Sequence, residues 1–362
     1  MRARGFDKGS PGRAWAREGA YDKLEPMKEP ILKIGSLELE SPVILAPMCG
    51  VCDIPYIKLM RRYDQESLVF HEMFSAVGLL NWGRRKDNAP AFRVPDDVKP
   101  LGLQLFGHEP EAMGQAARIL ADAGAAVIDV NLGCPVPKIT KGCDGSALLK
   151  DTPLLREILK AMIRYVPDKP VTIKMRLGWD DDQRNYVEVA KIAEDAGVAA
   201  ITVHGRTRSQ MYTGSADWEA IAEVVQAVSI PVIGNGDLYD PIVAVQRLKE
   251  SGCKGVMFGR GAQGNPWIIP RTAHYFKTGE LLPEPSDVER LRVALDHCML
   301  LIEEKGERTG VPECRKHVAW YTKGMHASAD LRHRVNQTQT REALVEVIEN
   351  FIEILSGAPA VA

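Results

Sequence analysis

The chain has 362 residues, of which 45% are hydrophobic and 26% are charged, and its formal net charge is -2. These values are typical of a soluble globular protein and exclude a polycation, so any contact with nucleic acid has to come from a local basic patch. The seven cysteines are odd in number and dispersed, which argues against a disulfide framework and favours a reducing compartment, the cytoplasm by default.

Residues 1–30 mix both charge signs with glycine and proline and contain no apolar run. The segment is therefore neither a signal peptide nor a membrane span, and we expect a disordered N-terminal extension. The next residues, Ile31–Ser41, predict a small hairpin ahead of the first long strand. No later stretch is long and apolar enough to cross a bilayer.

Eight short, nearly continuous apolar runs follow, and helical patterns separate them. Such runs are typical of parallel strands that are buried on both faces. The predicted strands are Val43–Pro47, Leu68–Met73, Leu101–Phe106, Ala126–Asn131, Val171–Arg176, Ala199–His204, Pro231–Asn235 and Gly255–Gly259. Asp151, Thr152 and Pro153 predict a capped helix start between two of them. The fold class is α/β, and we predict a (β/α)8 TIM barrel over residues 31–280, with an open doubly wound sheet as the alternative.

The alternation stops near Gly279, and the Pro-rich stretch Leu281–Asp287 reads as a linker. Residues 287–355 show helical periodicity only, which predicts a small C-terminal all-helical domain. Between Glu313 and Arg341 this domain has six basic residues against two acidic ones, with two aromatic residues among them. A solvated helix face explains that charge as well as a nucleic-acid contact does.

Polar residues and glycines gather where the predicted strands end, which is where TIM barrels place their function. They are Pro47, Met48, Gln104, Asn131, Cys134, Lys174, Arg176, His204, Arg206, Asn235, Gly236, Asp237, Gly259 and Arg260. The loops after the last two strands are rich in glycine, which lets backbone amides approach a phosphate closely. We therefore expect a phosphate site there, although each loop alone could be a tight turn.

Three of these residues suggest individual roles. Cys134 follows a strand directly, and a free thiol with a pKa of about 8.5 suits a proton donor better than a nucleophile. Lys174 lies inside an apolar strand and needs an anionic partner, either a reduced flavin or an internal carboxylate. His204 could donate to a phosphate or to a substrate carbonyl. The structural alternatives are a packing cysteine and a satisfied core histidine.

Two further sequence patterns give no evidence of a site of their own. Gly259, Gly261 and Gly264 match a G-x-G-x-x-G motif, but they follow the last strand of the series, so we reject a dinucleotide-binding reading. Cys49 and Cys52 form a C-x-x-C that no second pair completes, so we expect no metal site.

The motifs together resemble the tRNA-dihydrouridine synthase family. NLGCPVPKITKGCDGSALL resembles the family signature that contains the catalytic cysteine, and APMCGVCDIPY resembles its flavin-binding start. LQLFG, IKMRLGW, HGRTRSQMYTG, IPVIGNGD and GRGAQGNPWI follow in the family order, and CRKHVAWY is similar to the helical domain of the bacterial B-type branch. The family usually has alanine and threonine at positions 49 and 52 and a more apolar stretch at 143 and 144.

The resemblance implies an FMN-dependent reduction of the uridine C5–C6 double bond in tRNA, driven by NADPH, with position 17 of the D-loop favoured. Hydride would pass from FMN N5 to C6, and Cys134 would protonate C5. The implied FMN-binding residues are Pro47, Met48, Cys49, Gln104, Lys174, His204, Asn235, Gly236, Asp237, Gly259 and Arg260. The base has to leave its stack to reach a barrel mouth.

The implied substrate and RNA contacts are Asn131, Lys138, Lys141, Arg176, Arg206, Arg208, Arg315 and Lys316. We expect tRNA to be bound by the helical domain of residues 287–355, and we expect a monomer. Two alternatives remain: a flavin barrel that acts on a free pyrimidine, and a non-catalytic RNA-binding protein on the same barrel.

Overall fold

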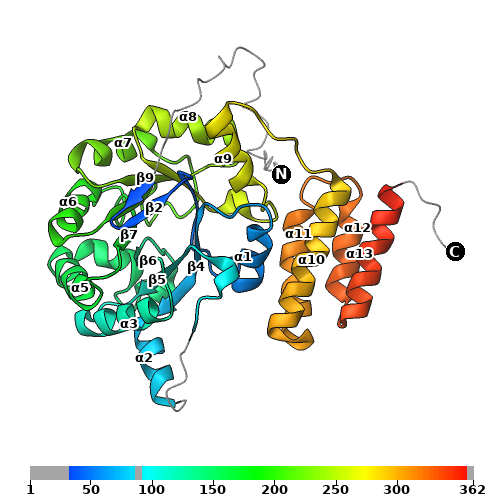
Figure 1. Ribbon diagram of the computed structural model, residues 1–362, viewed down its shortest axis with the longest axis horizontal. Coiled ribbons are helices and arrows are strands. Elements are labelled where there is room, and N and C mark those ends of the chain that lie inside the picture. Colours follow the sequence, from blue (N-terminus) through cyan, green and yellow to red (C-terminus); the bar gives the residue numbers. More distant parts are fainter. Residues whose placement is uncertain (1–31, 86–91, 357–362) are drawn as a thin grey trace, which may run out of the picture.

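The computed structural model describes residues 32–85 and 92–356 (Figure 1). The extension expected over residues 1–30 lies outside this range. Among the described helices, none combines the length and the apolar character that crossing a bilayer requires.

Eight parallel strands close into a barrel, because the last strand pairs with the first. Closure confirms the predicted TIM barrel, and the open doubly wound sheet is wrong. Around the barrel the order is β3 (Val43–Leu45), β4 (Leu68–Ser75), β5 (Leu101–Phe106), β6 (Val127–Leu132), β7 (Val171–Arg176), β8 (Ala200–His204), β9 (Val232–Asn235) and β10 (Gly255–Phe258).

The helices between the strands form the outer layer in Figure 1. They are α1 (Ile54–Arg61), α2 (Ala76–Arg85), α3 (Pro110–Asp122), α5 (Thr152–Tyr165), α6 (Tyr186–Ala196), α7 (Trp218–Ala227), α8 (Pro241–Ser251) and α9 (Ile268–Thr278). The short α4 (Pro137–Thr140) lies in the loop after β6, where its residues line the cavity described below. Local chemistry sets their ends: the Asp151 side chain accepts from the Leu154 amide at the start of α5, as predicted. Gly252 ends α8 with φ 72°, a left-handed conformation that glycine adopts without strain.

The lower half of the barrel interior is apolar. The hairpin β1 (Leu32–Ile34) and β2 (Leu37–Leu39) confirms the prediction for this segment. Its side chains pack with interior residues such as Phe70 and Met257, and so it closes the end where the strands begin. Only the opposite end, where the strands finish, is left for a site.

The chain ends in four helices, which lie beside the barrel in Figure 1. They are α10 (Asp287–Lys305), α11 (Glu307–Tyr321), α12 (Ser328–Gln337) and α13 (Arg341–Leu355), and they share an apolar core of their own. Leu59 of α1 packs against Val293 and Tyr321 of the helical domain. Lys305 also binds Asp53 at 2.6 Å, so the helices sit against the mouth side of the barrel.

Candidate active site

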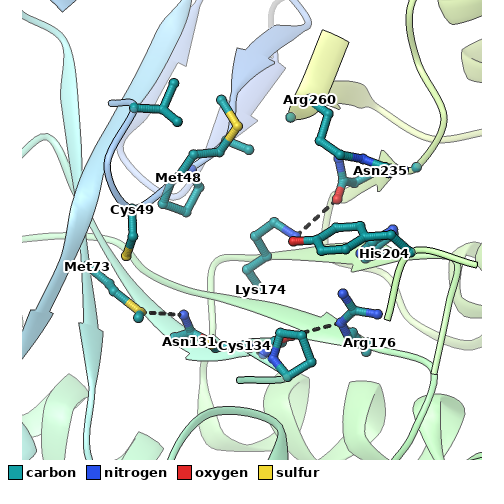
Figure 2. A pocket seen from close by; sticks show the side chains of 18 of the residues that line it. Met48, Cys49, Met73, Asn131, Cys134, Lys174, Arg176, His204, Asn235 and Arg260 are labelled. Atoms are coloured by element: carbon teal, nitrogen blue, oxygen red, sulfur yellow. Dashed lines mark hydrogen bonds between the residues drawn. The ribbon is translucent and has the colours of Figure 1, made fainter. Parts of the chain in front are cut away.

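A cavity of about 590 Å³ opens at the carboxyl ends of the strands (Figure 2). The strand-end residues that sequence analysis singled out meet there, because parallel strands in a closed barrel finish at one rim. The predicted residues that line the cavity are Pro47, Met48, Cys49, Gln104, Asn131, Cys134, Lys138, Lys174, Arg176, His204, Asn235, Gly236, Asp237, Gly259 and Arg260. Lys141, Arg206, Arg208, Arg315 and Lys316 do not line it.

Cys134 lies in a loop that is held from both sides. The Asn131 Oδ1 accepts from the backbone amides of Gly133 at 3.0 Å and Cys134 at 2.8 Å. The Cys134 carbonyl in turn accepts from the Ser146 hydroxyl at 2.9 Å. Burial raises the pKa of the Cys134 thiol, although the nearby Arg176 charge opposes this. The thiol is therefore protonated at neutral pH, as an acid must be before it acts.

Lys174 lies near the centre of the cavity (Figure 2), and its Nζ donates to the Asn235 Oδ1 at 3.0 Å. Burial, followed by the Arg176 charge, lowers the pKa of Lys174 to about 8. Its one hydrogen-bond partner among the described residues is a neutral amide. An ammonium group in this setting gains most from an anion that enters the cavity.

The wall of the cavity that the loops after β8, β9 and β10 form is positively charged and rich in unused backbone donors. Arg260 lies over the Tyr212 ring at 4.5 Å and reaches the Asp237 Oδ1 at 3.3 Å. Burial and four surrounding cations hold the pKa of His204 well below its usual range, so its imidazole is neutral. In the described part of the chain, the backbone amides of Gly236, Asp237 and Gly259 donate no hydrogen bond. Such amides, beside cations, are the donors that a phosphate needs.

Arg176 serves both the fold and the cavity. Its Nε donates to the Gly133 carbonyl at 2.8 Å, and its Nη1 donates to the carbonyls of Thr207 and Met211. Within the described residues its Nη2 makes no hydrogen bond. One donor of a firmly held guanidinium is therefore available to a ligand.

Arg206 does not face the mouth, which corrects the expectation that it contacts RNA directly. Its side chain is 1% exposed, and it donates to the carbonyls of Thr213 and Gly214 and to Asp237 at 2.7 Å. These partners make it a support of the loops after β8 and β9. Arg315 is also engaged, because its Nη2 donates to the Thr338 carbonyl at 2.8 Å.

The remaining predicted cations lie on or after α4, in the loop after β8, and on α11. Lys138 and Lys141 are exposed on and just after α4. Arg208 stacks on Trp179 with 4.3 Å between guanidinium carbon and ring centroid. Lys316 of α11 reaches the loop after β3, where a Cβ on Gly50 would lie 3.3 Å from its Nζ. The helical domain thus adds a positive charge near the cavity rim.

Sequence reasoning did not single out several side chains that line the cavity, among them Tyr212, Tyr239 and Met73. Tyr212 and Tyr239 are exposed at its edge, and Met73 accepts from the Asn131 Nδ2 at 3.1 Å. Tyr212 belongs to the stretch HGRTRSQMYTG, whose aromatic residue was a usable signal. Met73 reaches the cavity because the register of β4 shifts between Phe70 and Met73, which the sequence pattern does not reveal.

Two sequence motifs resolve into packing. Gly261 and Gly264 lie where an added Cβ would meet the Leu238 carbonyl oxygen at 2.2 Å and the Trp320 backbone at 2.4 Å. Both glycines therefore allow close backbone contacts. The helix α9, and not another strand, follows them, so they do not open a dinucleotide-binding βαβ unit. The Cys52 thiol is buried and donates to the Ala46 carbonyl, whereas Cys49 is exposed in the cavity.

Comparison with known proteins identifies the family. The sequence profile of dihydrouridine synthase (Dus) matches residues 44–356. A probable tRNA-dihydrouridine synthase of Rickettsia bellii (strain RML369-C) is 43% identical over 321 residues, which cover 89% of this chain and 98% of that protein. The tRNA-dihydrouridine synthase B of Xanthomonas campestris pv. campestris is 42% identical over 329 residues, which cover 91% and 98%.

Solved structures show the same fold at low identity. A 2-naphthoyl-CoA reductase complex aligns with a TM-score of 0.52 and 14% identity over 69% of this chain. Histamine dehydrogenase from Rhizobium sp. 4-9 aligns with a TM-score of 0.52 and 12% identity over 77% of this chain. The chain spans about half the length of each, 52% and 51%. From the profile and the relatives, the chain belongs to the dihydrouridine synthase family of flavin-dependent oxidoreductases, and within it to the bacterial B-type branch.

Proposed function

We propose that this protein is a tRNA-dihydrouridine synthase that uses FMN and NADPH to reduce a D-loop uridine, with position 17 favoured. The observation that carries the proposal is the placement of Cys134. Its protonated thiol shares one cavity with a half-buried lysine, whose one hydrogen-bond partner among the described residues is a neutral amide, and with a wall of unused amides. Acid, anion site and phosphate site are the parts that a flavin-dependent uracil reductase needs.

The cavity residues fit FMN on three counts. Lys174 would pair with the electron-rich edge of the ring, since the described residues give it only the neutral Asn235 as a partner. The amides of Gly236, Asp237 and Gly259, with Arg260 and His204 nearby, would hold the phosphate. The apolar side of the cavity, with Pro47 and Met48, would flank the ring.

The chain's own residues then account for the proton. When bound, reduced FMN supplies hydride to C6 of the uracil. Cys134 donates its thiol proton to C5, and the high pKa of the thiol keeps that proton available at neutral pH. The uncommitted Nη2 of Arg176 would donate to a uracil carbonyl and stabilise negative charge that develops there.

The rim would hold the tRNA. The cations that would contact RNA are Lys138, Lys141, Arg208 and Lys316. The phosphates on either side of the flipped-out nucleotide would pass close to these side chains. We assign residues 31–280 to the catalytic barrel and residues 287–355 to tRNA binding. We propose that the protein acts as a monomer in the cytoplasm, where tRNA is found.

The test is mass spectrometry of nucleosides from unmodified tRNA after incubation with FMN-loaded protein and NADPH. The wild type is expected to add two mass units to one uridine. Cys134→Ala is expected to slow this step by roughly 10²–10⁴-fold, the usual contribution of a general acid, while it still binds FMN. The mapped position identifies the uridine.

Other outcomes would point elsewhere. If the wild type binds and reduces FMN but modifies no tRNA, while free uracil or orotate is reduced, the protein is a small-pyrimidine dehydrogenase. If the protein binds tRNA but Cys134→Ala changes no activity, a non-catalytic RNA-binding role gains support. Equal rates with NADH and NADPH would remove the assignment of NADPH.

A further inference from the structure

A buried carboxylate lies beneath the site, and the chemistry described so far does not use it. Asp129 lies on β6 inside the barrel, and it is 2% exposed. It accepts from the Thr172 hydroxyl at 2.6 Å and from the Gln104 Nε2 at 2.7 Å. A buried charge is costly unless hydrogen bonds compensate it, so its presence calls for an explanation.

The hydrogen bonds continue from Asp129 to the Cys134 loop. The Gln104 Oε1 accepts from the Asn131 Nδ2 at 2.8 Å. The Asn131 Oδ1 then accepts from the Gly133 and Cys134 amides at 3.0 and 2.8 Å. Asp129, Gln104 and Asn131 therefore form one relay, which we call the Asp129 relay, and it ends on the backbone of the acid.

The direction of every bond in the relay follows from its first member. An ionised carboxylate can only accept, so the Gln104 amide nitrogen has to face it, and the Gln104 oxygen has to face Asn131. That oxygen requires the nitrogen of Asn131, which leaves the Asn131 oxygen for the two loop amides. With Gln104 reversed, its nitrogen would oppose the Asn131 nitrogen, and Asn131 could hold the loop only by leaving a donor without an acceptor.

We propose that Asp129 is a positioning residue for Cys134: its carboxylate fixes the orientation of Gln104 and Asn131 and so holds the loop that presents the thiol. This inference rests on the proposed function, in which Cys134 is the acid. Support of this kind, one residue removed from the reacting groups, is how sites keep their geometry. A displacement of about 1 Å in a catalytic group can cost on the order of 10²-fold in rate.

The surroundings keep Asp129 ionised in the physiological range. Burial raises the pKa of Asp129 to about 6, against the two hydrogen bonds and the Lys174 charge. The charged group that acts on it is Lys174 of β7, while β5 contributes the neutral Gln104. Because the relay needs the carboxylate, it is intact above pH 6 and weakens as the pH falls through that value.

The experiment compares FMN-loaded wild type with Asp129→Asn and Asp129→Leu. Asn keeps one oxygen acceptor but also brings a donor, whereas Leu removes every acceptor. Thr202→Val is the matched control, because Thr202 is a buried polar residue of β8 outside the relay and outside the cavity lining. Stopped-flow absorbance measures flavin reduction by NADPH and, separately, flavin reoxidation by unmodified tRNA.

We expect reoxidation by tRNA to slow at least tenfold in Asp129→Leu and less in Asp129→Asn, with flavin reduction within about twofold of the wild type. The wild-type reoxidation rate should decrease as the pH is lowered below about 6. This decrease at low pH should be absent in Asp129→Asn. Equal losses in both half-reactions would overturn the proposal, because they would indicate general damage to the flavin pocket. Wild-type reoxidation in a folded Asp129→Asn would overturn it as well.

A second readout does not depend on tRNA. Peptide mass spectrometry follows alkylation of Cys134 by iodoacetamide, with Cys49 in the same cavity as internal reference. Release of the loop should speed Cys134 alkylation several-fold in Asp129→Asn and leave Cys49 unchanged. An unchanged Cys134 rate contradicts the relay. If wild-type flavin is not reoxidised by tRNA, the proposed function fails, and the alkylation rates still decide whether Asp129 positions Cys134.

Discussion

Lys174 of β7 is half-buried and Arg206, in the loop after β8, is buried, whereas Lys138 and Lys141 stand exposed at the barrel mouth. The interior cations are held by hydrogen bonds to Asn235 or to loop carbonyls, and burial shifts the pKa of Lys174. The rim cations are exposed to solvent. The difference teaches that burial separates basic residues near strand ends that are held by acceptors of the protein itself from those that stay exposed to solvent.

The largest expected effect concerns the interior lysine. Lys174→Met should weaken FMN binding by at least tenfold, about 1.4 kcal/mol, because the electron-rich edge of the ring loses its ammonium partner. Fluorescence titration of the apo-protein with FMN measures the affinity. The matched control is Lys191→Met on the exposed face of α6, which should leave the affinity unchanged. Equal affinities for the two variants would contradict the distinction between interior and rim.

The second effect concerns stability. Arg206→Met should lower the free energy of unfolding by ~2 kcal/mol or more, since it leaves two loop carbonyls without their donor and removes one of the two guanidinium groups that bind Asp237. Arg118→Met is the control: Arg118 is 33% exposed, binds Asp122 and Asp168 at the surface, and should contribute less than about 1 kcal/mol. Urea unfolding of both apo-proteins provides the comparison, and similar losses would show that burial of Arg206 does not matter.

A smaller effect should separate the rim from the interior. Replacing Lys138 and Lys141 together with glutamine should weaken tRNA binding several-fold and reduce the slope of log affinity against log salt by about one to two. FMN affinity should stay at the wild-type value, since both lysines are solvated. Filter binding at several salt concentrations measures the slope. An unchanged slope would contradict the assignment of these two lysines to the RNA interface.

The smallest effect is the pH dependence that Lys174 gives to the apo-protein. The folded-state pKa of Lys174, about 8, lies below the ordinary lysine value of 10.5, so between these two values the unfolded chain binds more protons than the folded one. Stability should therefore rise with pH across this window. Melting temperatures of wild type and Lys174→Met, compared between pH 7 and 10, should differ most at pH 7, with the variant more stable. A constant difference would contradict a buried, strained ammonium.

The sequence by itself determined much of this protein. Eight apolar runs with helices between them predicted the barrel, because strands buried on both faces cannot alternate polar and apolar residues. Since parallel strands finish at one edge, it also placed Cys134, Lys174 and the glycine loops together. The resemblance of its motifs to a known family indicated the class of reaction.

Only the tertiary structure decided which residues that are close in sequence have the same structural role. Arg206 and Arg208 lie two residues apart, yet one is buried under three acceptors and the other stacks on Trp179 near the rim. Asp129 and Asn131 lie on the same face of a strand, a period-two signal that was readable, but nothing in the sequence shows that Gln104 of another strand joins them. Burial and hydrogen-bond partners come from strands and loops distant in sequence, and closure of the barrel brings these together.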